Sequence, residues 1–108
     1  MIEVREYIDP SGRSPFERWL AKLDEVTRFR VAQVVARMRS GNFSAAKAVG
    51  RGISEMRLDF GPGYRIYFGK DGETLVILLG GGSKQRQQND IELAQALWQQ
   101  YKKQKREE

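Results

Sequence analysis

The sequence predicts an α+β domain in which a small, mainly antiparallel four-stranded sheet packs against an N-terminal helical hairpin and a C-terminal helix. Two hydrophobic periods support this prediction. Residues 14–39 show the spacing of amphipathic helices, and residues 54–68 alternate with the two-residue period of half-buried strands. With 108 residues, 40% of them apolar, the chain suits one domain spanning residues 1–108.

The N-terminal third begins with a predicted strand over residues 2–8, where apolar and charged residues alternate. A helix start follows. Ser14 is the expected N-cap, Pro15 takes the first helical position, and Glu17 stands where a capping box places an acidic residue. Asp24 is a plausible second N-cap. These signals divide the segment into two helices joined by a tight corner.

The middle of the chain predicts a three-stranded meander. Residues 54–60 and 64–68 alternate between apolar and polar, and the pair Asp71-Gly72 is a strong hairpin signal. Residues 74–79 are almost entirely apolar, which is typical of a central strand covered on both faces. We expect the glycines at 80–82 to leave the sheet.

A last helix is predicted from the apolar spacing over residues 91–101, and residues 102–108 are expected to fray as a basic tail.

The chain has no Cys and no His, which excludes disulfides, thiol nucleophiles and imidazole catalysis. The N-terminus lacks a signal-peptide pattern, and no run approaches the roughly 20 apolar residues of a membrane span. We therefore expect a cytoplasmic protein with no membrane partner.

The net charge is +5, and it is unevenly distributed: residues 13–47 carry eight basic and three acidic groups. Such a chain is attracted to nucleic acid or to acidic partners by a salt-sensitive force. A solvated surface that maintains solubility accounts equally for this charge.

Arg57 and Arg65 occupy polar positions of two neighbouring predicted strands. If these strands pair, both guanidinium groups project from one sheet face, and such a pair of like charges indicates an anion site. The alternative is that Glu55 and Asp59 neutralise the two arginines as ion pairs of little energetic value. Tyr67 has the same phase as Arg65, so it could stack on a base or fill the sheet edge.

Lys84 and Arg86 follow the glycines at the end of the buried strand. They could place positive charge beside a ligand, or simply form a basic approach to the last helix. A P-loop is excluded because the order and spacing around Gly82-Ser83-Lys84 are wrong.

Three segments together resemble the RelE/ParE toxin superfamily, in its addiction-module killer (HigB-like) branch. They are GRGISEMRL at 50–58, GPGYRIYF at 61–68 and LGGGSKQRQQ at 79–88. The resemblance implies a RelE-like fold and a toxin of a type II toxin–antitoxin pair. Relatives of the RelE kind cut messenger RNA in the ribosomal A site without a metal or any cofactor.

Carried over by position, the resemblance implies a catalytic set of Arg57, Arg65, Lys84 and Arg86. Attack of a ribose 2′-OH on the adjacent phosphate builds negative charge that fixed cations stabilise. Arg65 is expected to hold the phosphate bidentately, Arg57 to neutralise developing charge, and Lys84 or Arg86 to assist the leaving oxygen.

Further RNA contacts are expected from Lys47, Arg51 and Tyr67. Two positions depart from the pattern of these relatives: Glu55 replaces a basic residue, and Asp90-Ile91 stands where a Tyr is usual. The general base is unassigned, with Glu55 and Tyr67 as candidates by proximity.

The implied partners are a cognate antitoxin of helix-turn-helix type, the ribosome with its mRNA, and operator DNA only through the antitoxin complex. Two alternatives stay open. One is a ParE-like poison of DNA gyrase without ribonuclease activity, and the other is a non-catalytic corepressor of the antitoxin.

Overall fold

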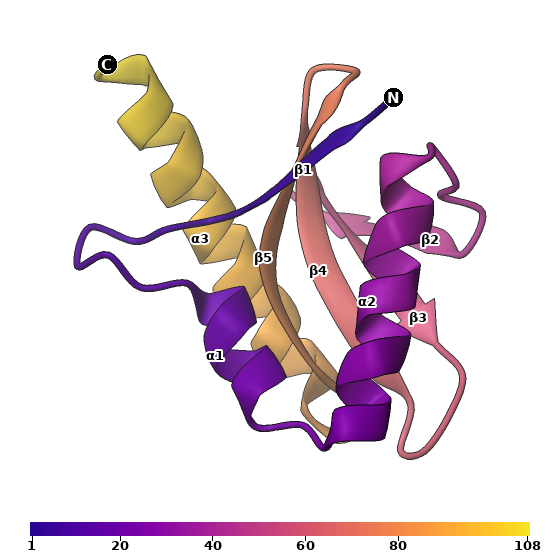
Figure 1. Cartoon of the computed structure of the whole chain (residues 1–108). Helices are drawn as coiled ribbons and strands as arrows, with labels where there is room; N and C mark the ends of the chain where they lie inside the picture. Colours follow the sequence, from indigo (N-terminus) through magenta and orange to yellow (C-terminus); the bar gives the residue numbers. More distant parts are fainter.

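A five-stranded sheet forms the middle layer of the protein, whose computed structural model describes all 108 residues (Figure 1). The strand order is β1-β5-β4-β3-β2, with β1 parallel to β5 and every other pair antiparallel. The strands are β1 Glu3–Glu6, β2 Ala46–Gly50, β3 Ile53–Leu58, β4 Tyr64–Asp71 and β5 Leu75–Ser83. The α+β class and the mainly antiparallel sheet are confirmed, but the predicted number of four strands is wrong by one.

The missed strand is β2, which pairs antiparallel with β3 at the sheet edge. Its sequence, AKAVG, is short and rich in small residues, and the register shifts between Ala48 and Gly50. An exposed edge strand of this kind buries too little side-chain surface to produce a regular alternation of apolar residues. Its pairing with β3 therefore leaves no clear trace in the local sequence.

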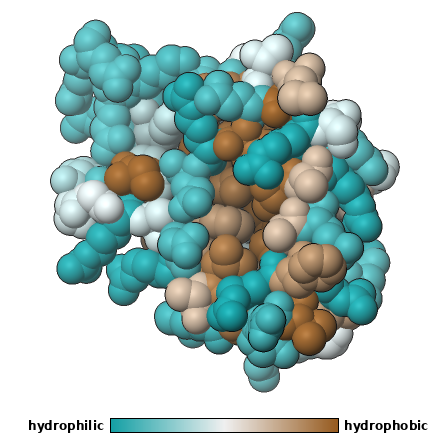
Figure 2. All heavy atoms as spheres, viewed as in Figure 1, coloured by the Kyte–Doolittle hydropathy of each residue, from teal (hydrophilic) through white to brown (hydrophobic).

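Two helices, α1 Pro15–Ala21 and α2 Glu25–Arg39, cover one face of the sheet (Figure 1). Both predicted N-caps are confirmed: Ser14 Oγ accepts the Glu17 amide at 3.0 Å, and Asp24 Oδ1 accepts the Thr27 amide at 3.0 Å. Figure 2, viewed from this side, shows hydrophobic atoms gathered along the middle of the face, with hydrophilic atoms around them.

The third helix, α3 Gln87–Arg106, covers the opposite face after a short 3₁₀ turn, η1 Lys84–Arg86 (Figure 1). The strand β5 separates two cores. Val76 and Leu78 pack on the side of α1 and α2, whereas Ile77 and Leu79 pack with Trp98 and other residues of α3. The prediction that this strand is covered on both faces is confirmed. No helix has both the length and the apolar character needed to cross a bilayer.

The C-terminal segment 102–108, expected to fray, is helical as far as Arg106. Contacts with distant residues stabilise it. Lys105 Nζ lies 2.5 Å from Asp71 Oδ2, and Gln104 Nε2 donates to the Tyr7 hydroxyl at 3.2 Å. These partners are far away in the sequence, which explains why the tail looks disordered when its composition is considered alone.

The glycines at 80–82, expected to leave the sheet, belong to β5. Two of them permit close packing. A Cβ at Gly81 would overlap the Trp19 indole, and a Cβ at Gly82 would overlap the Asp90 carboxylate. The absent side chains therefore let α1 and α3 approach the same strand from opposite faces.

We expect Gly81→Ala to destabilise the protein by roughly 1–3 kcal/mol, because the new methyl group must displace Trp19. Gly80→Ala is the matched control on the same strand, since a Cβ there meets nothing within 4 Å, and its effect should stay within about 0.5 kcal/mol. Urea denaturation of both variants measures the difference. Equal stability of the two variants would contradict the packing argument.

Candidate functional site

The sheet register brings several predicted site residues onto the face covered by α3. Arg57 on β3 lies directly opposite Arg65 on β4, which lies opposite Gly82 on β5. Residues directly opposite in antiparallel strands share a face, with side chains close together. The same register places Lys47 opposite Glu55. One row across three strands thus carries two of the expected cations.

Arg65 is buried, with a side-chain exposure of 7%. Its Nε lies 3.5 Å from Glu55 Oε2, and its Nη1 donates to the Gly63 carbonyl oxygen at 3.2 Å. The resemblance implies that this guanidinium holds a phosphate bidentately. The structure instead directs it to a buried carboxylate and a main-chain oxygen, so Arg65 is placed to position other groups.

Glu55, the partner of Arg65, is equally buried and connects the sheet to α3. Gln87 Nε2 donates to its two carboxylate oxygens at 3.1 and 3.2 Å. Glu55 is therefore satisfied by an ion pair and by an amide from the first turn of α3. Both carboxylate oxygens are occupied by buried partners, so Glu55 is poorly placed to take a proton from RNA as the unassigned general base.

Tyr67 is 1% exposed, so it has no free face on which a base could stack. Its hydroxyl is buried without a hydrogen-bond partner. Burial, and then the carboxylates of Glu55 and Asp90, raise the pKa of Tyr67 far above its usual value, against a smaller opposing effect of Arg65. The phenol stays protonated and cannot act as a base near neutral pH.

Arg57 is the accessible arginine of the row. Its side chain is 58% exposed, and its Nε lies 3.1 Å from Asp59 Oδ1, itself 79% exposed. Exposed pairs of this kind are worth little because water screens them. A phosphate can therefore replace Asp59 at small cost. A shallow cavity of about 260 Å³ lies here, and Lys47 and Glu55 also line it.

Lys84 and Arg86, in the 3₁₀ turn after β5, are both exposed. The amide of Lys84 donates to the Gly63 carbonyl oxygen at 2.8 Å, the same oxygen that accepts from Arg65. This shared acceptor holds the start of the turn against the β3–β4 connection. Lys84 thus stands near the row of arginines, two residues beyond Gly82.

Arg51 is the one predicted site residue that lies apart. It stands in the turn before β3, whereas Arg57 is close to the other end of that strand. Six residues of extended chain span about 20 Å. Arg51 is the only non-glycine residue with a positive φ, 54°, in keeping with a tight turn.

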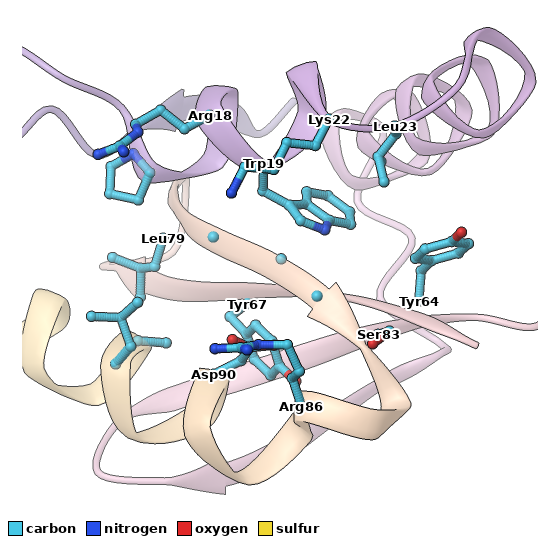
Figure 3. A pocket seen from close by; sticks show the side chains of 16 residues that line it. Arg18, Trp19, Lys22, Leu23, Tyr64, Tyr67, Leu79, Ser83, Arg86 and Asp90 are labelled. Atoms are coloured by element: carbon cyan, nitrogen blue, oxygen red, sulfur yellow. The ribbon is translucent and has the colours of Figure 1, made fainter. Parts of the chain in front are cut away.

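A larger cavity, of about 610 Å³, lies between α1 and α3 beside the last residues of β5 (Figure 3). Arg18 and Trp19 of α1 line it together with Lys22, the residue that follows α1. Arg86 and Asp90 line it from the opposite side. The pattern of the α1 residues predicts an ordinary amphipathic helix with Trp19 on its apolar face, so the local sequence gives no sign of this cavity.

In the sequence, Asp90 stands out only because the toxin pattern usually has a Tyr in this region. Its Oδ2 is buried without a hydrogen-bond partner. Burial raises the pKa of Asp90, and the nearby Arg86 guanidinium opposes this shift. The signal that could have revealed this contact is Gly82, where the absence of a side chain makes room for the carboxylate.

The chain is similar to one curated protein from Haemophilus influenzae, strain Rd, described as an uncharacterized protein. The two are 41% identical over 83 residues, which is 76% of this chain and 84% of the relative. No family model matches the chain.

The buried Glu55–Arg65 pair can be tested with a double-mutant cycle. Removing either partner, as in Glu55→Gln or Arg65→Met, should destabilise the protein by roughly 3–5 kcal/mol, because the remaining charge is left buried without its partner. The double variant should lose clearly less than the sum of the two losses. Additive losses in urea denaturation would show that the two side chains act independently.

The raised pKa of Asp90 predicts how the stability of the protein changes with pH. Because its pKa is raised on folding, its ionisation lowers stability as pH rises from the unfolded-state pKa through the folded-state pKa. Asp90→Asn should therefore gain stability relative to the parent as pH rises from 4 to 7.

Asp71→Asn is the control for Asp90→Asn. Hydrogen bonds from Lys105 and Tyr101 lower the pKa of Asp71, so its ionisation stabilises the fold as pH rises from the folded-state pKa through the unfolded-state pKa. Asp71→Asn should therefore lose stability relative to the parent as pH rises over a lower range, from about 2.5 to 5. Denaturation midpoints at the two ends of each range measure the two trends. Equal trends in the two variants would contradict the assignment.

Proposed function

This chain belongs to the same family as the Haemophilus influenzae protein, and from its site we propose that it is a toxin of a type II toxin–antitoxin pair that cleaves messenger RNA on the ribosome. One observation carries the proposal. Arg57, Lys84 and Arg86 are exposed cations at the end of the sheet where the register aligns Arg57, Arg65 and Gly82.

The exposed cations suit the charge that develops in RNA cleavage. When a ribose 2′-OH attacks the adjacent phosphate, the phosphorane gains negative charge, and its leaving oxygen must be stabilised. In the proposal Arg57 exchanges Asp59 for the phosphate, while Lys84 or Arg86 stabilises the leaving oxygen. Arg65 contacts no RNA. It holds Glu55 and Gly63, and through Gly63 it positions Lys84.

The proton on the 2′-OH needs an acceptor, and neither earlier candidate suits that role. Glu55 is held by Arg65 and Gln87, and Tyr67 stays protonated. We therefore propose that solvent water accepts this proton while the 2′-oxygen bonds to phosphorus. The P–O5′ bond then breaks, and the 5′-oxygen takes a proton from solvent. Much of the rate enhancement comes from positioning of the mRNA on the ribosome. The proposal uses no cofactor, places the action in the cytoplasm, and includes an antitoxin of helix-turn-helix type that connects the toxin to operator DNA.

A second candidate function is poisoning of DNA gyrase without RNA cleavage. The observation that favours it is that Arg57 and Arg65 each have a carboxylate partner, Asp59 and Glu55 respectively. Paired arginines leave fewer free cations for phosphate than the sequence suggests. The same experiment separates the two functions.

The test is induced expression followed by mapping of transcript 5′ ends. Codon-phased cuts in translated messages are expected for the parent. Arg57→Gln should lower cutting by roughly 10²-fold, because one preorganised cation is lost from the transition state. Arg39→Gln, which changes an exposed arginine at the end of α2, should cut like the parent.

Both variants change exposed side chains, so thermal denaturation should show parental stability for each. Growth arrest with intact messages and altered DNA supercoiling would favour the gyrase alternative. Unchanged cutting by Arg57→Gln would remove Arg57 from the site.

A further inference from the structure

The last part of β5 has a free edge. The strand β1 pairs with β5 only from Leu75 to Leu78, whereas β4 pairs with it as far as Ser83. Residues 79–83 therefore have a neighbouring strand on one side only. This segment is about 16 Å long and borders the 610 Å³ cavity between α1 and α3.

The register shows which main-chain groups lie at this edge. The Lys84 amide donates to Gly63, and the pairs Arg65↔Gly82 and Tyr67↔Gly80 follow along the ladder. Main-chain groups of an antiparallel strand point to alternate sides. Gly80 and Gly82 thus direct their N–H and C=O groups to β4, and Gly81 and Ser83 direct theirs away from it. Two residues, i and i+2, present donors and acceptors to the cavity.

Helices lie beside this edge on both faces of the sheet. Trp19 and Leu23 line the cavity from the side of α1 (Figure 3). Leu93, which is 56% exposed, lines it from α3. Trp19 packs over Gly81, and the Asp90 carboxylate packs against Gly82 from the other face. The strand is held between the helices while its edge stays open. We call this region, residues 79–83 with the facing walls, the β5 slot.

The charge of the β5 slot is positive. Arg18 and Lys22 on α1 and Arg86 beside α3 line it, against the single carboxylate of Asp90. Apolar and cationic side chains occur on both walls. A strand entering the slot would direct alternate side chains toward each wall, so a chain with apolar and acidic residues meets complementary groups on both.

We propose that the β5 slot binds an extended, acidic segment of a partner protein, which adds to the sheet as a strand beside β5. Main-chain hydrogen bonds to Gly81 and Ser83 supply affinity, and Arg18, Lys22 and Arg86 select acidic side chains. A polypeptide fits these features better than RNA does, because only a polypeptide repeats donors and acceptors at the spacing of a strand edge. The inference does not depend on the proposed function.

The test is NMR titration of the full-length protein with a capped seven-residue peptide of alternating Glu and Val. The Gly81 and Ser83 amides should shift and then exchange at least tenfold more slowly with solvent, whereas the Gly80 and Gly82 amides should be protected before the peptide is added. The same peptide N-methylated at its three central residues should not bind, because it lacks the donors for the edge. A Lys-Val peptide should bind at least tenfold more weakly.

Matched charge reversals complete the design. Arg18→Glu/Lys22→Glu should weaken binding of the Glu-Val peptide at least tenfold, and Arg39→Glu/Lys103→Glu, equal in charge but outside the slot, should weaken it less than threefold. All four side chains are exposed, so folding should persist. Absence of shifts at Gly81 and Ser83 at millimolar peptide would overturn the proposal. So would tighter binding of a single-stranded oligouridylate to the same amides, which would assign the slot to RNA.

Discussion

Beneath the first turn of α3, Glu55 and Arg65 form an ion pair in which each side chain is only 7% exposed. Charges removed from water in this way are tolerated because each has the other as partner, and Gln87 adds an amide to the carboxylate. The pair connects β3 with β4, and Gln87 connects both with α3. Through Gly63, Arg65 also shares an acceptor with the Lys84 amide. The arrangement of the candidate site therefore depends on this one interaction.

The two arginines at this end of the sheet differ in whether they can bind a ligand. Arg65 is held by buried partners, so its contribution is to fix the positions of its neighbours. Arg57, directly opposite on β3, has only an exposed carboxylate as partner and is free to exchange it for another anion. Neighbouring arginines with the same strand phase thus differ in availability because α3 covers one of them and leaves the other in solvent.

The glycines of β5 also position neighbouring elements, because they allow two helices to pack closely on this strand. Gly81 and Gly82 allow Trp19 and Asp90 to approach the strand from opposite faces. Because β1 ends beside Leu78, the main-chain groups of Gly81 and Ser83 also form an unpaired edge. Close helix packing and an accessible main chain therefore coexist within residues 81–83, which border the 610 Å³ cavity.

Local sequence signals were enough to predict the helix starts at Ser14 and Asp24, the strands β3 and β4, and the shared face of Arg57 and Arg65, because caps and periodicity act between residues close in the chain. They left open whether the two arginines were free or paired.

Four features could not be predicted from local patterns: the burial of Arg65, the pairing of β2 with the sheet, the place of the glycines within β5 and the helical tail. Each outcome depends on a partner distant in the sequence, such as Trp19 for Gly81 or Asp71 for Lys105. Local propensity contains no information about such partners, since it is folding that brings them together.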